Sequence, residues 1–114
     1  MNESQPAAPD GTAENGARAV LWRLGDDMAK HNRPASLHLN DLSQGRWPSL
    51  DGMAPGDLRD RMAALQAAAI AAGNVPLAYF GVTVQERGLA LKILVDEIER
   101  IGQQIDALEP PAMH

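Results

Sequence analysis

The segment from Pro76 to Leu108 constrains the fold most strongly, because its apolar residues recur with alternating spacings of three and four. In heptad notation, the two stripe positions are held by Leu77, Val84, Leu91, Ile98 and Ile105, and by Phe80, Arg87, Leu94, Ile101 and Leu108. All of these residues except Arg87 are apolar, which predicts one long helix with a continuous apolar stripe. Such a helix would be about 50 Å long, which is too long for a chain of 114 residues to enclose.

The two halves of this predicted helix differ in composition. From Leu77 to Val95 the flanking positions are also apolar, which indicates burial among other helices. From Asp96 onward only the stripe is apolar, and the acidic residues, Glu97 included, are interpreted as a solvated face. We therefore predict that the distal half projects from the core and contacts another helix. The predicted interface residues are Leu91, Leu94, Ile98, Ile101, Ile105 and Leu108.

Three glycines share one heptad position in the same segment, namely Gly81, Gly88 and Gly102. Each glycine costs about 1 kcal/mol relative to alanine inside a helix, so we interpret this column as a place where another helix approaches closely. The alanine-rich stretch around Ala69 has the small side chains that suit such packing. The alternative is that Gly81 marks a break and the helix begins at Thr83, in a capping box with the glutamate three residues later. We favour the continuous helix, because the stripe keeps its register through the glycine.

The remaining boundaries follow from proline, glycine and composition. The N-terminal segment is polar and carries no large apolar residue after Met1, which is typical of disorder. Pro34 is expected to end the first helix, and Gly73 the second. The predicted segments are 1–16 for a disordered tail, 17–32, 57–72 and 76–108 for helices, 33–55 for a long loop, and 110–114 for a frayed end, with 17–109 as one helical domain.

The fold class expected from these elements is all-α. The short turn from Gly73 to Pro76 should join the second and third helices into an antiparallel αα-hairpin. The predicted architecture is thus a three-helix arrangement with this hairpin and a long C-terminal helix able to form a coiled coil.

Two residues of the long loop, Arg46 and Trp47, are candidates for recognition, because tryptophan and arginine dominate the energetics of protein interfaces. The alternative is that Trp47 folds back as a lid over a core that is poor in aromatic residues.

A metal site is the weaker of two interpretations of the histidines. Asp27 and His31 lie four residues apart on one predicted helix, close in sequence to His38 and Asp41, and imidazole with carboxylate suits zinc or iron. The other interpretation is an ion pair near a helix end. We expect no metal and no cofactor. The chain has no cysteine, which excludes disulfides and thiolate ligands.

No catalytic signature is present. The sequence lacks a phosphate-binding glycine loop and a nucleophile elbow, so we do not expect an enzyme. The net charge of −5 disfavours a nucleic-acid backbone as the partner. No apolar run approaches the length of a membrane span and no signal peptide is visible, so a cytoplasmic protein without membrane contact is expected.

The function expected is therefore non-catalytic protein–protein interaction through helix–helix contacts, as in an adaptor, inhibitor, chaperone or regulatory subunit. The partner is a second copy in a homodimer or higher oligomer, a helix of another protein, or both. One alternative is an intramolecular bundle in which the first helix covers the stripe and the Trp47 loop binds. Another is a helix-turn-helix DNA-binding regulator, because the stretch from Ala69 to Val75 resembles the turn of that motif.

Overall fold

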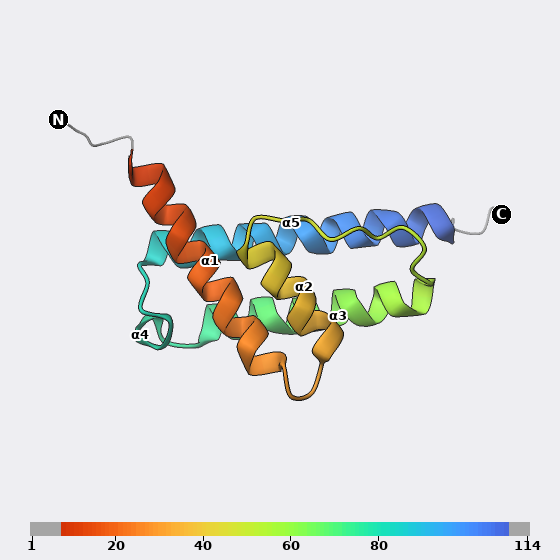
Figure 1. Cartoon of the computed structure of the whole chain (residues 1–114), viewed down its shortest axis with the longest axis horizontal. Coiled ribbons are helices and arrows are strands. Elements are labelled where there is room, and N and C mark those ends of the chain that lie inside the picture. The colour runs from red at the N-terminus through yellow and green to blue at the C-terminus, as the bar shows by residue number, and fades with distance from the viewer. Residues whose placement is uncertain (1–7, 110–114) are drawn as a thin grey trace.

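The part of the chain that the structure describes contains five helices. The computed structural model describes the backbone of residues 8–109 and the side chains of residues 13–109. The elements are α1 (Ala8–Met28), α2 (Arg33–Ser43), α3 (Pro55–Asn74), α4 (Leu77–Phe80) and α5 (Val84–Leu108). The prediction of an all-α protein is confirmed (Figure 1).

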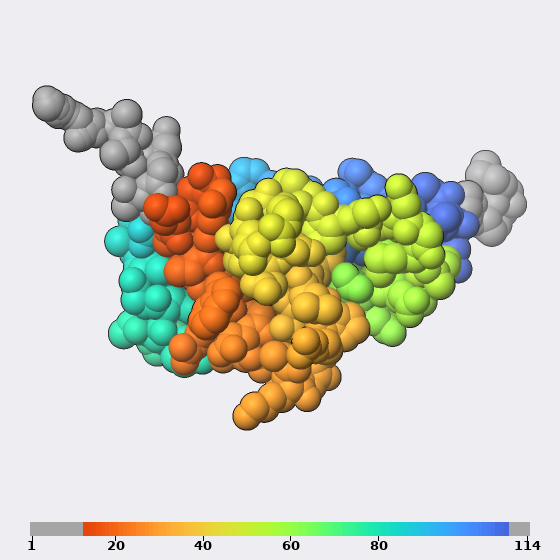
Figure 2. Space-filling model, viewed as in Figure 1, coloured from red at the N-terminus to blue at the C-terminus, as the bar shows by residue number. Residues whose placement is uncertain are grey.

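The helices form two layers. α3 and α5 lie side by side and run in opposite directions, while α1 and α2 pack together across one face of that pair (Figure 1). Figure 2 shows this face, on which α1, α2 and the segment after α2 cover much of α5. The molecule is elongated along α3 and α5, with dimensions of 59 × 30 × 23 Å. The core between the layers is built from leucine, isoleucine and alanine, and its largest fully buried apolar side chains are Val20, Leu21, Leu39, Leu58, Leu65, Leu94 and Ile101.

The predicted continuous helix over 76–108 is wrong, because the chain breaks between α4 and α5. Gly81 ends α4 with φ of 69°, a left-handed conformation that glycine adopts without strain. Thr83 then caps α5: its hydroxyl oxygen accepts from the Glu86 N–H at 3.1 Å, and a Glu86 carboxylate oxygen accepts from the Thr83 N–H at 2.7 Å. The alternative start at Thr83 is therefore correct, and the capping box is present.

The predicted loop 33–55 contains a helix of its own, α2. Pro34 lies in the first turn of this helix, where its missing N–H leaves no bond unmade. Asn32 is the N-cap, and its side-chain oxygen accepts from the Ala35 N–H at 3.2 Å. Together these residues begin a helix, at the place where Pro34 alone predicts that one ends.

The first helix also differs from its predicted range of 17–32. α1 begins at Ala8, inside the predicted disordered tail 1–16, and it ends at Met28. The predictions for residues 1–7 and for the frayed end at 110–114 lie outside the described residues.

Close helix packing occurs at a glycine outside the predicted column. A Cβ on Gly25 would lie 3.2 Å from the Ser36 carbonyl oxygen and 3.3 Å from the Leu39 Cβ, so α1 and α2 approach closely there. By contrast, a Cβ on Gly81 or Gly88 would meet nothing within 4 Å. A Cβ on Gly102 would make only an ordinary contact, with a sulfur 3.9 Å away, and Ala69 is half-buried against the core. Within a single chain, the predicted glycine column therefore does not mediate close packing.

The capping box gives a direct test of how α5 begins. Replacing Thr83 by alanine removes the acceptor for the Glu86 N–H, and we expect the free energy of unfolding to fall by about 1 kcal/mol in chemical denaturation. Thr83→Ser keeps a hydroxyl and serves as the control, with little expected change. Equal losses in the two variants would show that the cap does not stabilise α5.

Candidate functional site

The predicted interface stripe of α5 is mostly internal. Leu94 and Ile101 are fully buried and Ile105 is 8% exposed, so the predicted projecting half with an exposed stripe is wrong. The physical reason is α3, which runs along this half of α5, with Arg59 paired to Glu109 near its end. Of the other predicted interface residues, Leu91 and Ile98 are half-buried and Leu108 is 46% exposed.

A second apolar line runs along α5 beside its buried residues. We call it the outer stripe, and its members, again at alternating spacings of four and three, are Val84, Gly88, Leu91, Val95, Ile98 and Gly102. Val84, Gly88 and Val95 on this line are exposed, whereas its other members are half-buried against the rest of the chain. Val84 is 61% exposed and Val95 49% exposed. These values are high for large apolar side chains on a helix that also contributes to the core.

Charged residues border the outer stripe. Lys92 and Glu99 are exposed on one flank of it, three residues before and four residues after Val95. Lys92 pairs with Asp96 at 2.9 Å, and this ion pair is itself exposed, so it contributes little to stability and leaves both groups available to a partner.

On the inner side of α5, a charged group lies fully inside the protein. Glu97 is 0% exposed and His38 of α2 is 1% exposed, and the two are hydrogen-bonded. Arg100 donates to both oxygens of Glu97, from Nε at 2.5 Å and from Nη2 at 2.7 Å. Arg61 of α3 donates to His38 Nδ1 at 2.7 Å. We call these four residues the buried polar cluster.

The hydrogen-bond partners fix the protonation of the imidazole in this cluster. A guanidinium can only donate, so His38 Nδ1 accepts from Arg61 and must carry a lone pair. The hydrogen of the neutral ring is then on Nε2, which donates to Glu97. The cluster thus contains one carboxylate, two guanidinium groups and a neutral histidine.

The pKa shifts follow from these contacts. Burial alone would raise the pKa of Glu97. The hydrogen bonds from Arg100 and His38 together lower the pKa by more than burial raises it, so the pKa lies below its ordinary value. The hydrogen bond to Glu97 raises the pKa of Arg100. Burial lowers the pKa of Arg61, against smaller raising effects of Asp57 and Glu97.

The buried polar cluster differs from the sequence-based prediction, which places Glu97 on a solvated face. A signal was present: Glu97 continues the line of buried positions on α5, which is Ala90, Leu94, Glu97, Ile101 and Ile105. A carboxylate on a buried line predicts that other elements supply its partners.

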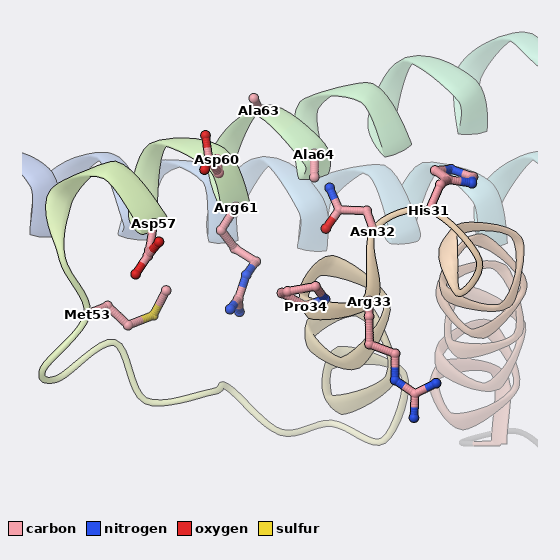
Figure 3. A pocket seen from close by; sticks show the side chains of 10 residues that line it. All are labelled: His31, Asn32, Arg33, Pro34, Met53, Asp57, Asp60, Arg61, Ala63 and Ala64. Atoms are coloured by element: carbon pink, nitrogen blue, oxygen red, sulfur yellow. The ribbon is translucent and has the colours of Figure 1, made fainter.

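Arg61 connects the buried polar cluster to a cleft of about 840 Å³ between the start of α2 and the first turns of α3. Its side chain extends into the middle of this cleft, with Asp57 and Met53 to one side and Asn32 and Pro34 to the other (Figure 3). The cleft therefore has a basic group at its centre and both polar and apolar walls.

The predicted recognition residues lie at a smaller pocket. Trp47 is 52% exposed and Arg46, paired with Asp41 at 3.0 Å, is exposed beside it. Both residues line a pocket of about 240 Å³ with Leu42, Leu89 and Ile93. The guanidinium of Arg100 lies 5.9 Å from the Trp47 ring centroid. The indole is thus only half covered, and it does not close over the core as the lid alternative required.

The four candidate metal ligands have other partners or lie apart. Asp27 accepts from the Tyr79 hydroxyl at 2.8 Å, Asp41 pairs with Arg46, and His38 belongs to the buried polar cluster. Among the side chains of residues 13–109, no group of three histidine, aspartate or glutamate residues has the arrangement of a metal site.

The stretch that resembles a helix-turn-helix turn is followed by a very short helix. α3 extends to Asn74, and α4 has only four residues, from Leu77 to Phe80. A recognition helix must reach into the major groove with several turns, which α4 does not provide.

Comparison of the chain with models of known protein families, with curated proteins and with solved structures gives no match. Over the residues described, no helix is both long enough and apolar enough to cross a lipid bilayer.

The ionised state of Glu97 has a testable consequence for stability. Its folded-state pKa is below the ordinary value of 4.5, so the carboxylate stabilises the fold above that pH, and the contribution is lost as the pH falls through the folded-state pKa. Glu97→Gln should lower the free energy of unfolding by about 2–3 kcal/mol at neutral pH, because the three hydrogen bonds from Arg100 and His38 lose their charged acceptor.

The difference from wild type should then shrink in acid, as measured by denaturation at a series of pH values. Asp106→Asn, an exposed change of the same kind on α5, should make little difference at any pH. A Glu97→Gln deficit that stays constant from neutral to acidic pH would contradict this assignment.

Proposed function

We propose that the protein is a non-catalytic interaction module that pairs with a second copy of itself through the outer stripe of α5. The observation that carries the proposal is a line of apolar residues, exposed at Val84, Gly88 and Val95, on a helix that also fills the core. Apolar stripes of this kind, rimmed by polar residues, mark sites of protein contact. Roles as an adaptor, an inhibitor, a chaperone or a regulatory subunit are all compatible with such a module.

The order of residues along the outer stripe supports a second copy as the partner. Gly88 and Gly102 each lie seven residues from Val95, with Leu91 and Ile98 between them and the valine. A two-fold contact requires a surface that is complementary to itself. When two α5 helices pair antiparallel about Val95, Gly88 lies opposite the partner's Gly102, and the backbones can approach at both ends.

The flanking charges fit the same register. In an antiparallel pair centred on Val95, Lys92 lies near the partner's Glu99, and the reciprocal pair forms on the other side of the two-fold axis. Opposite charges at such flanking positions favour one orientation of two helices over another. The parallel arrangement would turn this flank toward the partner's other flank and would not bring Lys92 and Glu99 together.

The size of the contact sets the expected affinity. A single pair of helices buries less than the roughly 800 Å² per partner of a standard interface. We therefore expect a dimer that dissociates on dilution.

The central test is a change at the middle of the stripe. Val95→Asp places two carboxylates together on the two-fold axis, and we expect at least a tenfold rise in the dimer dissociation constant, measured by light scattering over a concentration series. Ala67→Asp makes the same kind of change at an exposed position on α3 and should leave the dimer intact. A wild-type chain that remains monomeric up to roughly millimolar concentration would contradict the proposal.

A second change separates folding from pairing. Gly88→Ala adds a methyl group that meets nothing in its own chain, so it should raise the free energy of unfolding of the monomer by about 0.5–1 kcal/mol through helix propensity. The same methyl group should weaken the dimer by holding the helices apart. Gly73→Ala, on α3 with equally open surroundings, should leave the dissociation constant unchanged. Equal dimer affinities of the Gly88→Ala variant and wild type would contradict the close approach of the two helices.

A further inference from the structure

We propose that the cleft between α2 and α3 binds an oxyanion, a carboxylate or phosphate group, through the guanidinium of Arg61. This site is separate from the outer stripe, and its test does not depend on self-association. Three features carry the proposal: the net charge of the buried polar cluster, the surroundings of Arg61, and the chemistry of the cleft walls.

The buried polar cluster has an excess positive charge. Both oxygens of Glu97 accept from Arg100, so this carboxylate is already neutralised. The neutral ring of His38 passes no negative charge to Arg61. The sum over the cluster is one positive charge, and it belongs to the guanidinium that reaches the cleft.

Arg61 carries that charge without an ion pair among the described residues. No carboxylate of residues 13–109 lies within 4.0 Å of its guanidinium nitrogens, and its hydrogen-bond partner within that range is His38 Nδ1 at 2.7 Å. A guanidinium has five N–H donors, so most of its donors remain for a ligand. Partial burial disfavours its charge, and an anion placed opposite would offset that cost.

The walls of the cleft indicate what else the ligand contains. Arg33 borders the cleft with its guanidinium directed away from Arg61 (Figure 3). Asn32 uses its side-chain oxygen as the helix cap, which leaves its amide NH₂ as a donor. Met53, Pro34 and Ala64 provide apolar contact. A volume of about 840 Å³ far exceeds that of a single inorganic ion. The ligand class is therefore an organic acid or phosphate ester with an apolar portion.

Two acidic residues, Asp57 and Asp60, line the cleft and oppose an anion. Asp57 lies one helical turn before Arg61 and extends into the same cleft (Figure 3). Because it competes with a bound oxyanion for Arg61, simple anions should bind weakly, and removing its charge should strengthen their binding. This competition provides a variant that tests the site by a gain of affinity.

The experiment is a nuclear magnetic resonance titration of the full chain at constant ionic strength, with inorganic phosphate in one arm and benzoate in the other. The Arg61 side-chain N–H and the Asn32 amide group report on the cleft. In wild type we expect saturable shifts of these signals in at least one arm. Stronger binding of phosphate assigns the site to phosphate esters, and stronger binding of benzoate assigns it to carboxylic acids.

Two variants decide between specific binding and general ionic effects. Arg61→Gln keeps a donor for His38 and should weaken binding about tenfold or more. Asp57→Asn changes an exposed residue and should tighten binding about two- to threefold. The proposal is overturned if neither probe gives saturable shifts in wild type, or if Asp57→Asn leaves the affinity unchanged. Equal affinities in wild type and Arg61→Gln would overturn it as well.

Discussion

The burial of Glu97 is the constraint on which the rest of the structure depends. An ionised carboxylate without partners costs several kcal/mol inside a protein, so the surrounding segments must meet it in one arrangement. His38 fixes α2, Arg61 links α3 through the imidazole, and Arg100 also donates to the Pro48 carbonyl oxygen at 2.6 Å. The cluster therefore sets the position of two helices and of the connecting segment against α5, which apolar packing alone would leave free to slide.

This constraint gives α5 two apolar lines with different roles. The inner line, which includes Leu94 and Ile101, packs against the other helices together with Glu97. The outer stripe is offset from it around the helix, and its residues Val84, Gly88 and Val95 are exposed. A helix that is apolar over this width has more apolar surface than one chain covers. The physical basis for proposing a partner is thus the uncovered part of α5.

The sequence predicted the all-α fold class correctly. It did not predict which side of α5 is buried in the core. Periodicity identified α5 because apolar residues at spacings of three and four fall on one side of a helix and on no single face of a strand. The same spacing fits two offset lines, so it did not distinguish Ile101, which is buried, from Val95, which is exposed. The sequence did not predict α2, because Pro34 is expected to end the preceding helix. In the structure Pro34 lies in the first turn of α2, and Asn32 caps that helix. The buried polar cluster depends on contacts between distant segments, which local patterns do not contain.

The three glycines of the predicted column, Gly81, Gly88 and Gly102, differ in whether the folding of a single chain requires a glycine. Gly81 has a conformational reason, since its left-handed φ ends α4 before the cap of α5. Gly88 and Gly102 have regular helical geometry, and a methyl group would fit at either position in the single chain. Each costs about 1 kcal/mol of helix stability relative to alanine. Both lie on the outer stripe at equal distances from Val95, where a second helix would need their small size. The monomer thus gains nothing from these two glycines, whereas a close contact with a partner helix requires them.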